Sequence, residues 1–413
     1  MKIIDLFAGA GGLSEGFRNE NFDVLFHIEM DTEAAQTLKT RESYFYLKTT
    51  NQLKIYKKYI SGKISQNTLY SYVPNHLLRK VIVKEISSKS VHFLFKKIDN
   101  SLKDSQLDGI IGGPPCQAFS MIGRKSNLSK KADDSRIYLY QYYIKFLKRY
   151  QPKFFVFENV KGLKSFKDFR GELLLPQILN AFENVGYNCE YKVLNSLEYA
   201  VPQKRERIFI FGYRKDLPEI DFFSLLSKKK EMPVTLNKLF LDLPEIASGQ
   251  TLNEYKPNIE PDYIMKYYRI DNLPLSHNTA RPHSSRDLQI YKIVSEAKQK
   301  GIQTKYIDLP ENLRTHSNIT SFSDRFKALD YKGFSHTVVA HIAKDGHYYI
   351  HPDVNQNRSI TVREAARIQT FRDDYYFEGS RTSAFKQIGN AVPPKLSMKI
   401  SETIADLLVN NNI

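Results

Sequence analysis

Continuous apolar runs mark the strands expected in the first half of the chain. Residues 3–7 are largely apolar, and residues 24–28 are so again after a glycine-rich turn and a segment of helical length. Similar runs occupy residues 109–111, 154–157 and 208–211. Runs without polar alternation are typical of strands buried on both faces of a parallel sheet. The opening order of strand, turn, helix and strand indicates a βαβ unit, and the sequence predicts an α/β fold.

Helical signals appear later in the chain. We expect a helix over Ser135–Tyr150, because a capping residue precedes it and Pro152 lies just past its end. Thr361 and Glu364 have the spacing of a capping box and predict a helix start. A final amphipathic helix over Lys395–Val409 is expected to pack back on the first domain.

The chain of 413 residues is too long for one small core, so we expect two domains or one large domain with an insertion. After about residue 214, Pro, Asn, Ser, Lys and Tyr dominate and no period is sustained. We therefore predict a first domain over residues 1–215, an irregular second domain over 216–334, and a segment over 335–413 that returns to the first. A Lys-, Tyr- and Ser-rich stretch over about 45–95 is expected to be an insertion into the first domain.

Composition restricts the partners. A net charge of +16 and a pI near 9.4 favour a polyanionic partner such as nucleic acid, with general solubility as the alternative. No run approaches the roughly 18 apolar residues of a spanning helix, and no signal peptide is recognisable, so we expect a cytoplasmic protein without a membrane partner. Two cysteines and no Cys/His cluster exclude a disulfide framework and predict no metal.

A glycine-rich turn, FAGAGG, occupies residues 7–12 after the first expected strand. Such a turn lets backbone amides approach a ligand, although a purely structural turn is the alternative and its spacing differs from the GxGxxG of NAD sites. Glu29 ends the second expected strand, where its carboxylate can bind two ribose hydroxyls and Met30 can pack on an adenine. A solvated carboxylate is the alternative for Glu29. Ribose binding without a pyrophosphate loop points to S-adenosylmethionine.

Cys116 lies directly after an expected buried strand, on a turn that two glycines permit and two prolines stiffen. Ligands and chemistry gather at this carboxyl edge of a parallel sheet. An isolated cysteine is more often an inert core residue, but the polar, rigid setting argues against core packing. A nearby arginine would lower the thiol pKa and supply thiolate, which makes Cys116 the candidate nucleophile.

Glu158 follows the buried run 154–157 and is expected to emerge at the same edge as Cys116. A partly desolvated carboxyl group there can hold or deliver a proton at a ring nitrogen. Asn159 is expected to fix the geometry by bonding to backbone. Helix capping by the Glu158-Asn159 pair is the alternative.

The run QKRER at residues 203–207 is the remaining charged motif. Period-two spacing places Gln203, Arg205 and Arg207 on one side of an extended segment. The two guanidiniums would then form an anion site that orients Glu158, holds a base carbonyl or contacts phosphate. A charged edge strand in water is the alternative.

In this order the motifs resemble the cytosine-5 DNA methyltransferase family of bacterial restriction-modification systems. The resemblance spans residues 1–215 and 335–413 through DLFAGAGGLSEGF, GGPPCQAFS, ENV, QKRER, TVREAARIQTF and QIGNAVPP. It implies a Rossmann-like class I methyltransferase sheet that binds S-adenosylmethionine, and a small target-recognition domain. It also implies double-stranded DNA as partner, a monomer, and a cognate restriction endonuclease as a functional rather than a bound partner.

The resemblance further implies a mechanism. The target cytosine is flipped out of the duplex at a cost of roughly a few kcal/mol. The Cys116 thiolate attacks carbon 6 and Glu158 engages N3 and the exocyclic amine, so that carbon 5 takes the methyl group of S-adenosylmethionine. Loss of the carbon 5 proton releases 5-methylcytosine, with S-adenosylhomocysteine as the other product. Arg207 resembles the arginine that contacts the cytosine carbonyl and Glu158, with Arg205 beside it.

Cofactor contacts are implied in the same way. Phe7 resembles the aromatic residue that stacks on adenine, and the late residues Asn390 and Val392 resemble those that close the pocket. The loop from Gln117 to about Lys131 resembles the mobile segment that closes over DNA. The expected cofactor-binding residues are Phe7, Ala8, Gly9, Ala10, Gly11, Gly12, Leu13, Glu29, Met30, Asp99, Pro115, Leu139, Asn390 and Val392.

Two features depart from the family. Its members usually carry an acid that binds the adenine amine about 20 residues before the cysteine, and Asp99, 17 residues before Cys116, is the candidate here. The stretch over 45–95 is longer than is typical. Both a DNA contact through its lysines and a structural excursion remain open for it.

Three rival functions share some of these sequence features. A transfer RNA cytosine-5 methyltransferase has the same catalytic groups but typically a threonine where this chain has Ser120, and a shorter recognition region. A catalytically silent DNA-binding regulator would not need Cys116, Glu158 and both arginines. An amino-group methyltransferase uses an Asp/Asn-Pro-Pro-Tyr/Phe loop and needs no thiol. The sequence therefore favours the DNA enzyme.

Overall fold

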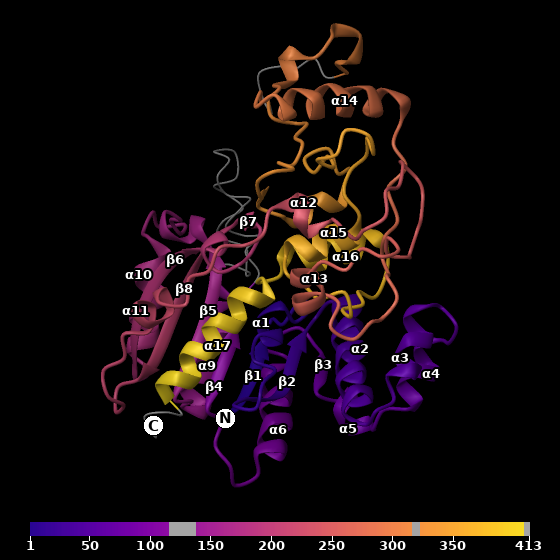
Figure 1. The fold of residues 1–413 in the computed structure, drawn as a ribbon. Helices are drawn as coiled ribbons and strands as arrows, with labels where there is room; N and C mark the ends of the chain where they lie inside the picture. Colours follow the sequence, from indigo (N-terminus) through magenta and orange to yellow (C-terminus); the bar gives the residue numbers. More distant parts are fainter. Residues whose placement is uncertain (115–137, 316–322, 409–413) are drawn as a thin grey trace.

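The computed structural model describes residues 1–114, 138–315 and 323–408. Its centre is a seven-stranded sheet in the order β3-β2-β1-β4-β5-β8-β6 (Figure 1). β1 to β5 run parallel to one another, whereas β8 is antiparallel to both β5 and β6. The strands are β1 Lys2–Leu6, β2 Asp23–Glu29, β3 Val81–Val83, β4 Gly109–Gly112, β5 Phe154–Val160, β6 Tyr187–Asn195 and β8 Glu206–Arg214. This arrangement confirms the expected α/β, Rossmann-like sheet.

The strand at residues 208–211 departs from expectation. Its apolar run predicts a strand of a parallel sheet, but β8 pairs with β5 in antiparallel register, with Glu158 opposite Phe209. Continuous hydrophobicity reports burial on both faces and carries no information on direction. The edge strands β3 and β6 were not predicted, because partial exposure breaks their apolar pattern.

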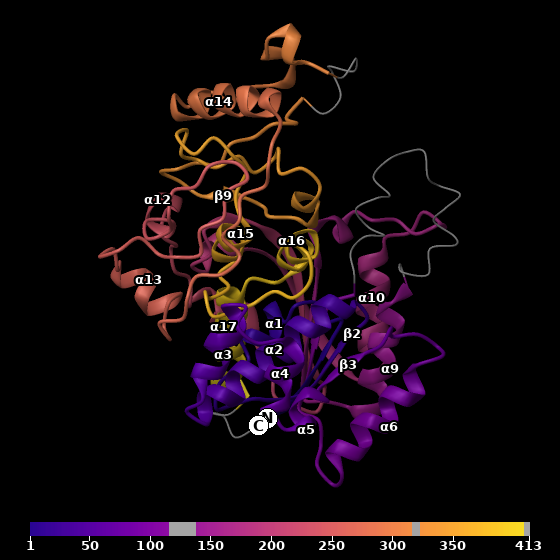
Figure 2. The ribbon, with the colours of Figure 1, turned by 90° about the vertical axis from the view of Figure 1, so that its right-hand side faces the viewer.

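Helices cover both faces of the sheet (Figures 1 and 2). One hydrophobic cluster joins it to α6, α9 and α10, and a second joins its other face to α1, α11 and α17. Ser401 of α17 donates a hydrogen bond to the carbonyl of Gly16, 2.6 Å away, which confirms that the final helix packs on the first domain. These helices are α1 Gly12–Glu15, α6 Val91–Leu102, α9 Tyr140–Tyr150, α10 Leu174–Glu183, α11 Phe222–Ser227 and α17 Pro394–Leu408. The start expected for α9 at Ser135 lies outside the described residues.

The second half of the chain has few strands among its described residues, and its hydrophobic clusters cross the predicted boundaries. α11 packs on the sheet, and residues between 236 and 275 share a core with α15 and α16. A separate outer cluster lies between residues 290 and 350, around α14. The elements are α12 Leu236–Leu239, α13 Asp262–Tyr267, α14 Ser285–Gln299, α15 Val362–Ile368, α16 Arg381–Asn390, and the strand pair β7 Gln203–Lys204 with β9 Ser335–His336. Thr361 and Glu364 form the expected capping box of α15.

The stretch over 45–95 extends α2 (Thr32–Thr49) and adds α3 (Leu53–Ile60), α4 (Gln66–Ser71) and α5 (Asn75–Leu78) before β3. Its inner face is rich in tyrosine. The Tyr56 hydroxyl donates to the carbonyl of Asp374 at 2.8 Å, and the Tyr59 hydroxyl donates to Glu378 at 2.6 Å. The insertion is therefore anchored to the segment between α15 and α16.

Two glycines at the carboxyl end of β4 allow close contact with the neighbouring strands. A Cβ on Gly112, whose φ is +135°, would lie 2.0 Å from the carbonyl oxygen of Leu6. A Cβ on Gly113 would lie 2.1 Å from the carbonyl oxygen of Glu158. The loop after β4 therefore leaves the sheet in backbone contact with the ends of β1 and β5, a path that residues with side chains cannot follow.

We predict that Gly112→Ala lowers the free energy of unfolding by at least about 2 kcal/mol, because it combines steric overlap with an unfavourable φ. Gly62→Ala is the matched control, since Gly62 has a φ of +70° but no atom within 4 Å of a built Cβ. The control is expected to cost only about 1–2 kcal/mol. Urea unfolding measures both, and equal losses would contradict the close approach.

Candidate active site

Glu158 and Arg207 form an ion pair at the ends of two neighbouring strands. The Arg207 Nε lies 3.3 Å from the Glu158 Oε1, and each side chain is about 15% exposed (15% and 16%). Burial raises the pKa of Glu158 above its usual value, while the charges of Arg207 and Arg205 act in the opposite direction. A carboxyl group with a raised pKa next to a fixed cation is suited to holding a proton during a reaction.

Asn159 connects this pair to the loop after β4. Its Nδ2 donates to the carbonyl of Pro114 at 3.3 Å, and its Oδ1 accepts from the backbone N–H of Val160 at 2.9 Å. The expected bond from Asn159 to backbone is therefore present. Cys116 and Pro115 lie outside the described residues. Gly113 and Pro114 precede these two residues directly and both contact β5. Gly113 lies against the carbonyl of Glu158, and Pro114 accepts the hydrogen bond from Asn159.

Cys189 is the second cysteine of the chain and lies on β6. Burial raises the pKa of its thiol to about 12, so it carries almost no thiolate at neutral pH. A thiol in this state is not a nucleophile. Cys116 is thus the one remaining candidate that the sequence offers.

The QKRER motif does not present all its expected side chains to one site. The Gln203 side chain donates to the carbonyl of Ile368 at 3.2 Å. Arg205 is fully buried, and its guanidinium donates to the carbonyls of Val338 and Gly389 at 2.7 and 3.2 Å. Arg207 forms the ion pair with Glu158, and the charge of Arg205 also lowers the pKa of Glu158. The extended segment is interrupted between β7 and β8, and the Arg205 guanidinium bonds backbone carbonyls, while the charges of both arginines act on Glu158.

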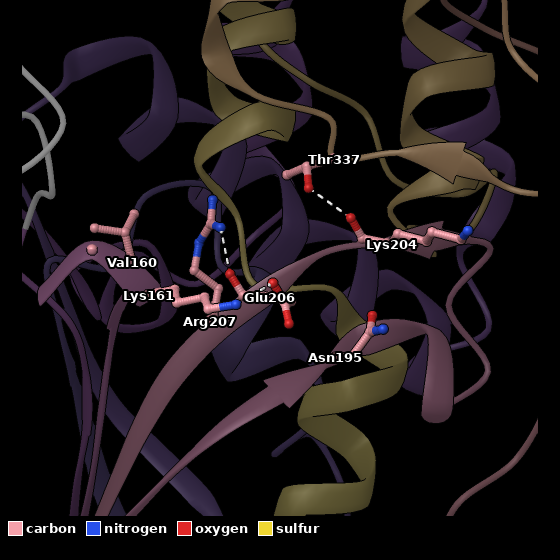
Figure 3. A pocket seen from close by; sticks show the side chains of 8 residues that line it. Val160, Lys161, Asn195, Lys204, Glu206, Arg207 and Thr337 are labelled. Carbon is pink, nitrogen blue, oxygen red and sulfur yellow. Dashed lines mark hydrogen bonds and ion pairs between the residues drawn. The ribbon is translucent and has the colours of Figure 1, made fainter. Parts of the chain in front are cut away.

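A cavity of about 450 Å³ opens beside Arg207, at the ends of β5, β6 and β8 (Figure 3). Lys161, Lys204 and Arg207 line it, together with Glu206 and Thr337. The Lys161 ammonium pairs with Glu206 at 2.9 Å, and the Thr337 hydroxyl donates to the Lys204 carbonyl at 2.7 Å. Three cations against one carboxylate give the cavity a net positive charge.

The glycine turn lies at the same edge of the sheet, after β1. Glu29 fixes the turn, because its carboxylate accepts a hydrogen bond from the backbone N–H of Gly9 at 2.7 Å. The same carboxylate accepts from the backbone N–H groups of Met30 and Asp31 at 2.9 and 2.8 Å. Burial raises the pKa of Glu29, although these bonds oppose the rise. A Cβ on Gly9 would meet no atom within 4 Å, so the turn faces open space. A half-buried carboxylate beside an open glycine turn fits a ribose.

Other expected cofactor residues surround this turn. Phe7 is half-buried with a φ of +58°, and Met30 is 61% exposed, so both offer apolar surface at the edge. Val392 approaches Gly12 so closely that a Cβ there would lie 2.2 Å from its carbonyl oxygen. Asn390 is exposed at the end of α16. The remaining described positions are Ala8, Ala10, Gly11 and Leu13, buried in the turn and α1, and the half-buried Leu139 before α9.

Asp99 does not lie with these residues. It is near the end of α6, where Arg149 and the Tyr150 hydroxyl bind its carboxylate at 2.5 and 3.0 Å. α6 runs back across the sheet after β3, so Asp99 reaches the amino ends of the strands rather than their carboxyl ends. The carboxylate that directly follows β3 is the exposed Glu85, with buried Ile86 after it. The helix α6 lies between Glu85 and β4, so Glu85 is farther from Cys116 along the chain than the family spacing predicts.

Within the described residues, no helix is both long and apolar enough to cross a membrane, and no group of three or more His, Cys, Asp or Glu could hold a metal ion.

Comparison with known proteins decides the family. The model of the C-5 cytosine-specific DNA methylases matches residues 1–66 and 47–406. The chain belongs to this family of DNA cytosine-5 methyltransferases. It is 38% identical to the type II methyltransferase M.Bpa9945I of Bacillus paralicheniformis over 99% of each chain. It is 31% identical to the type II methyltransferase M.DdeI of Desulfomicrobium norvegicum, over 100% of this chain and 90% of that one.

Solved structures agree with this assignment. A prophage-encoded Escherichia coli protein assigned as a DNA modification methyltransferase superposes with a TM-score of 0.63 at 25% identity, over 99% of each chain. The S. pombe Dnmt2 methyltransferase, at 15% identity and a TM-score of 0.52 over all of both chains, shares the fold. The chain is thus a DNA cytosine-5 methyltransferase of the bacterial restriction-modification type, and its family implies S-adenosylmethionine as methyl donor.

For this methyltransferase we predict that Arg207→Gln raises the pKa of Glu158 further, because the nearest cation that lowers it is lost. Carboxyl ¹³C NMR titration of labelled protein reads this pKa. Lys161→Gln is the matched control, since Lys161 pairs with Glu206 instead. An unchanged or lowered Glu158 pKa in Arg207→Gln would show that the pair does not set the electrostatics of the site.

Proposed function

We propose that the enzyme methylates carbon 5 of a cytosine within a specific sequence of double-stranded DNA, through a covalent bond between the Cys116 sulfur and carbon 6. The proposal rests on the ion pair between Glu158 and Arg207. The pKa of the Glu158 carboxyl group is raised, and the Glu158 carbonyl lies against Gly113, three residues before Cys116. The chemistry requires such a group, because attack at carbon 6 places electron density on the ring.

In the proposed reaction, the Cys116 thiolate forms the bond to carbon 6 while Glu158 holds a proton at N3. Electron density then moves to carbon 5, which becomes nucleophilic. Arg207 orients Glu158 and contacts the cytosine carbonyl. After methyl transfer, removal of the carbon 5 proton and expulsion of the thiolate restore the aromatic ring and the free enzyme. Asn159 positions the loop through Pro114.

S-adenosylmethionine supplies the methyl group when bound at the glycine turn. The residues fit this cofactor. The Glu29 carboxylate would bind the ribose hydroxyls, and Phe7 and Met30 offer apolar surface against which the adenine would pack. We assign the adenine amine to Glu85 in place of Asp99. The positively charged cavity at Lys161, Lys204 and Arg207 would hold phosphate of the target strand next to the flipped base.

We further propose that methylation protects host DNA from a cognate restriction endonuclease, in keeping with the type II methyltransferases to which the chain is similar. Residues of the 216–334 region would contact the bases of the target sequence. The enzyme would act as a monomer.

The proposal is tested with labelled S-adenosylmethionine and either duplex DNA or transfer RNA. We expect transfer to duplex DNA, no transfer by Cys116→Ala, and a fall of about 10²–10⁴-fold in Glu158→Gln, the range for loss of a general acid. Transfer to RNA alone, or transfer that survives Cys116→Ala, would overturn it. Bisulfite sequencing of the product gives the methylated site.

The cofactor assignment makes a separate prediction. Glu85→Ala is expected to weaken S-adenosylmethionine binding about 10–100-fold, the cost of losing a hydrogen bond to a charged group. Asp99→Ala, which removes the acid bound by Arg149, is expected to leave binding within about twofold. Isothermal titration calorimetry measures both, and the reverse order would restore Asp99 as the adenine-binding acid.

A further inference from the structure

Positive charge is concentrated in the insertion over residues 45–95. This stretch of 51 residues carries nine basic side chains and one acid, a net charge of +8, which is half of the +16 of the whole chain. One eighth of the sequence thus holds half of the charge. The basic residues are Lys48, Lys54, Lys57, Lys58, Lys63, Arg79, Lys80, Lys84 and Lys89.

Most of this charge faces solvent without a counter-charge. Lys48 pairs with Asp271 at 2.8 Å and Lys80 pairs with Asp23 at 3.0 Å. The other seven side chains are exposed and form no ion pair within the described residues. Lys84 also lies over the ring of Phe93, 5.7 Å from its centroid. Three of the seven, Lys54, Lys57 and Lys58, share the helix α3, and we call these three the basic face.

α3 shows how the basic face is presented. Lys54, Lys57 and Lys58 follow one another at helical spacing on its outer side, while its buried residues pack inward. Like charges at this spacing repel each other by about 0.2–0.5 kcal/mol per pair, so an anion that bridges them is favoured. The tyrosines bound to Asp374 and Glu378 anchor the same helix from behind. The charges therefore stand on a fixed support.

The basic face is separate from the catalytic site. It lies at the β3 edge of the sheet, beyond α2, whereas Glu158 lies on β5, four strand positions away (Figure 1). At about 4.8 Å per strand, these positions are roughly 19 Å apart across the sheet. An anion bound at the basic face is thus distinct from the flipped cytosine and its neighbouring phosphates.

We propose that the basic face is a second DNA-binding surface, which contacts the phosphate backbone of duplex outside the target sequence. The inference rests on the proposed function for the identity of its partner. Neutralising phosphates releases counterions, so this surface contributes affinity that is independent of sequence and sensitive to salt. Its effect is to keep the enzyme on long DNA between target sites.

The test compares full-length wild type with Lys54→Gln/Lys57→Gln/Lys58→Gln and with a control triple, Lys148→Gln/Lys215→Gln/Lys228→Gln. The control lysines are exposed, carry the same charge, and lie away from the insertion, near α9, β8 and α11. Binding to duplex without the target sequence is measured as a function of salt. Methyl transfer is measured in parallel on plasmid DNA and on a short duplex with one target site.

We expect the α3 triple to reduce the slope of log affinity against log salt by about 0.9 to 2.7, for one to three lost phosphate contacts. Its KM on plasmid should rise several-fold while kcat and the short-duplex KM stay unchanged. The control should match wild type. Equal slopes and equal plasmid KM values in both triples would overturn the inference. Absence of methyl transfer by wild type would instead refute the proposed function, and the binding slopes would still report on the basic face.

Discussion

The close approach of three backbones at the carboxyl edge of the sheet is the constraint on which the site depends. Gly112 lies against the Leu6 carbonyl and Gly113 against the Glu158 carbonyl, at distances that leave no room for a Cβ. The ends of β1, β4 and β5 are thereby brought together. β1 leads into the glycine turn, β4 leads toward Cys116, and β5 carries Glu158. The cofactor turn, the loop to the nucleophile and the acid thus share one edge.

A second layer of buried polar contacts fastens the rest of the chain to this edge. Arg205 bonds the carbonyls of Val338 and Gly389, which connects the strand beside the site to the returning segment. Arg367 of α15 is fully buried and pairs with both Asp242 and Asp373. Removing one partner of a buried pair costs about 3–5 kcal/mol, so such pairs tolerate little rearrangement. They hold the second half of the chain in one orientation relative to Glu158.

Much of this arrangement was predictable from the sequence, because burial and turn chemistry leave local signals. The parallel strands, the capping box at Thr361 and the position of Glu158 at a strand end all follow from patterns of a few residues. The antiparallel direction of β8 and the inward turn of Arg205 do not, since both depend on distant partners. Spacing from the cysteine points to Asp99, but α6 reverses the chain direction after β3 and carries Asp99 to Arg149 instead. Recognition of β3 in the sequence would have shown that Glu85 follows a strand end, where we propose that it binds the cofactor.

The account predicts one covalent bond, and mass spectrometry detects it most directly. A duplex in which 5-fluorocytosine replaces the target cytosine cannot lose a proton from carbon 5, so the reaction stops with the base attached to the enzyme. With S-adenosylmethionine present, the intact mass should rise by one DNA strand plus a methyl group, and peptide mapping should locate the bond at Cys116. An adduct at another residue, or turnover without an adduct, would contradict the mechanism.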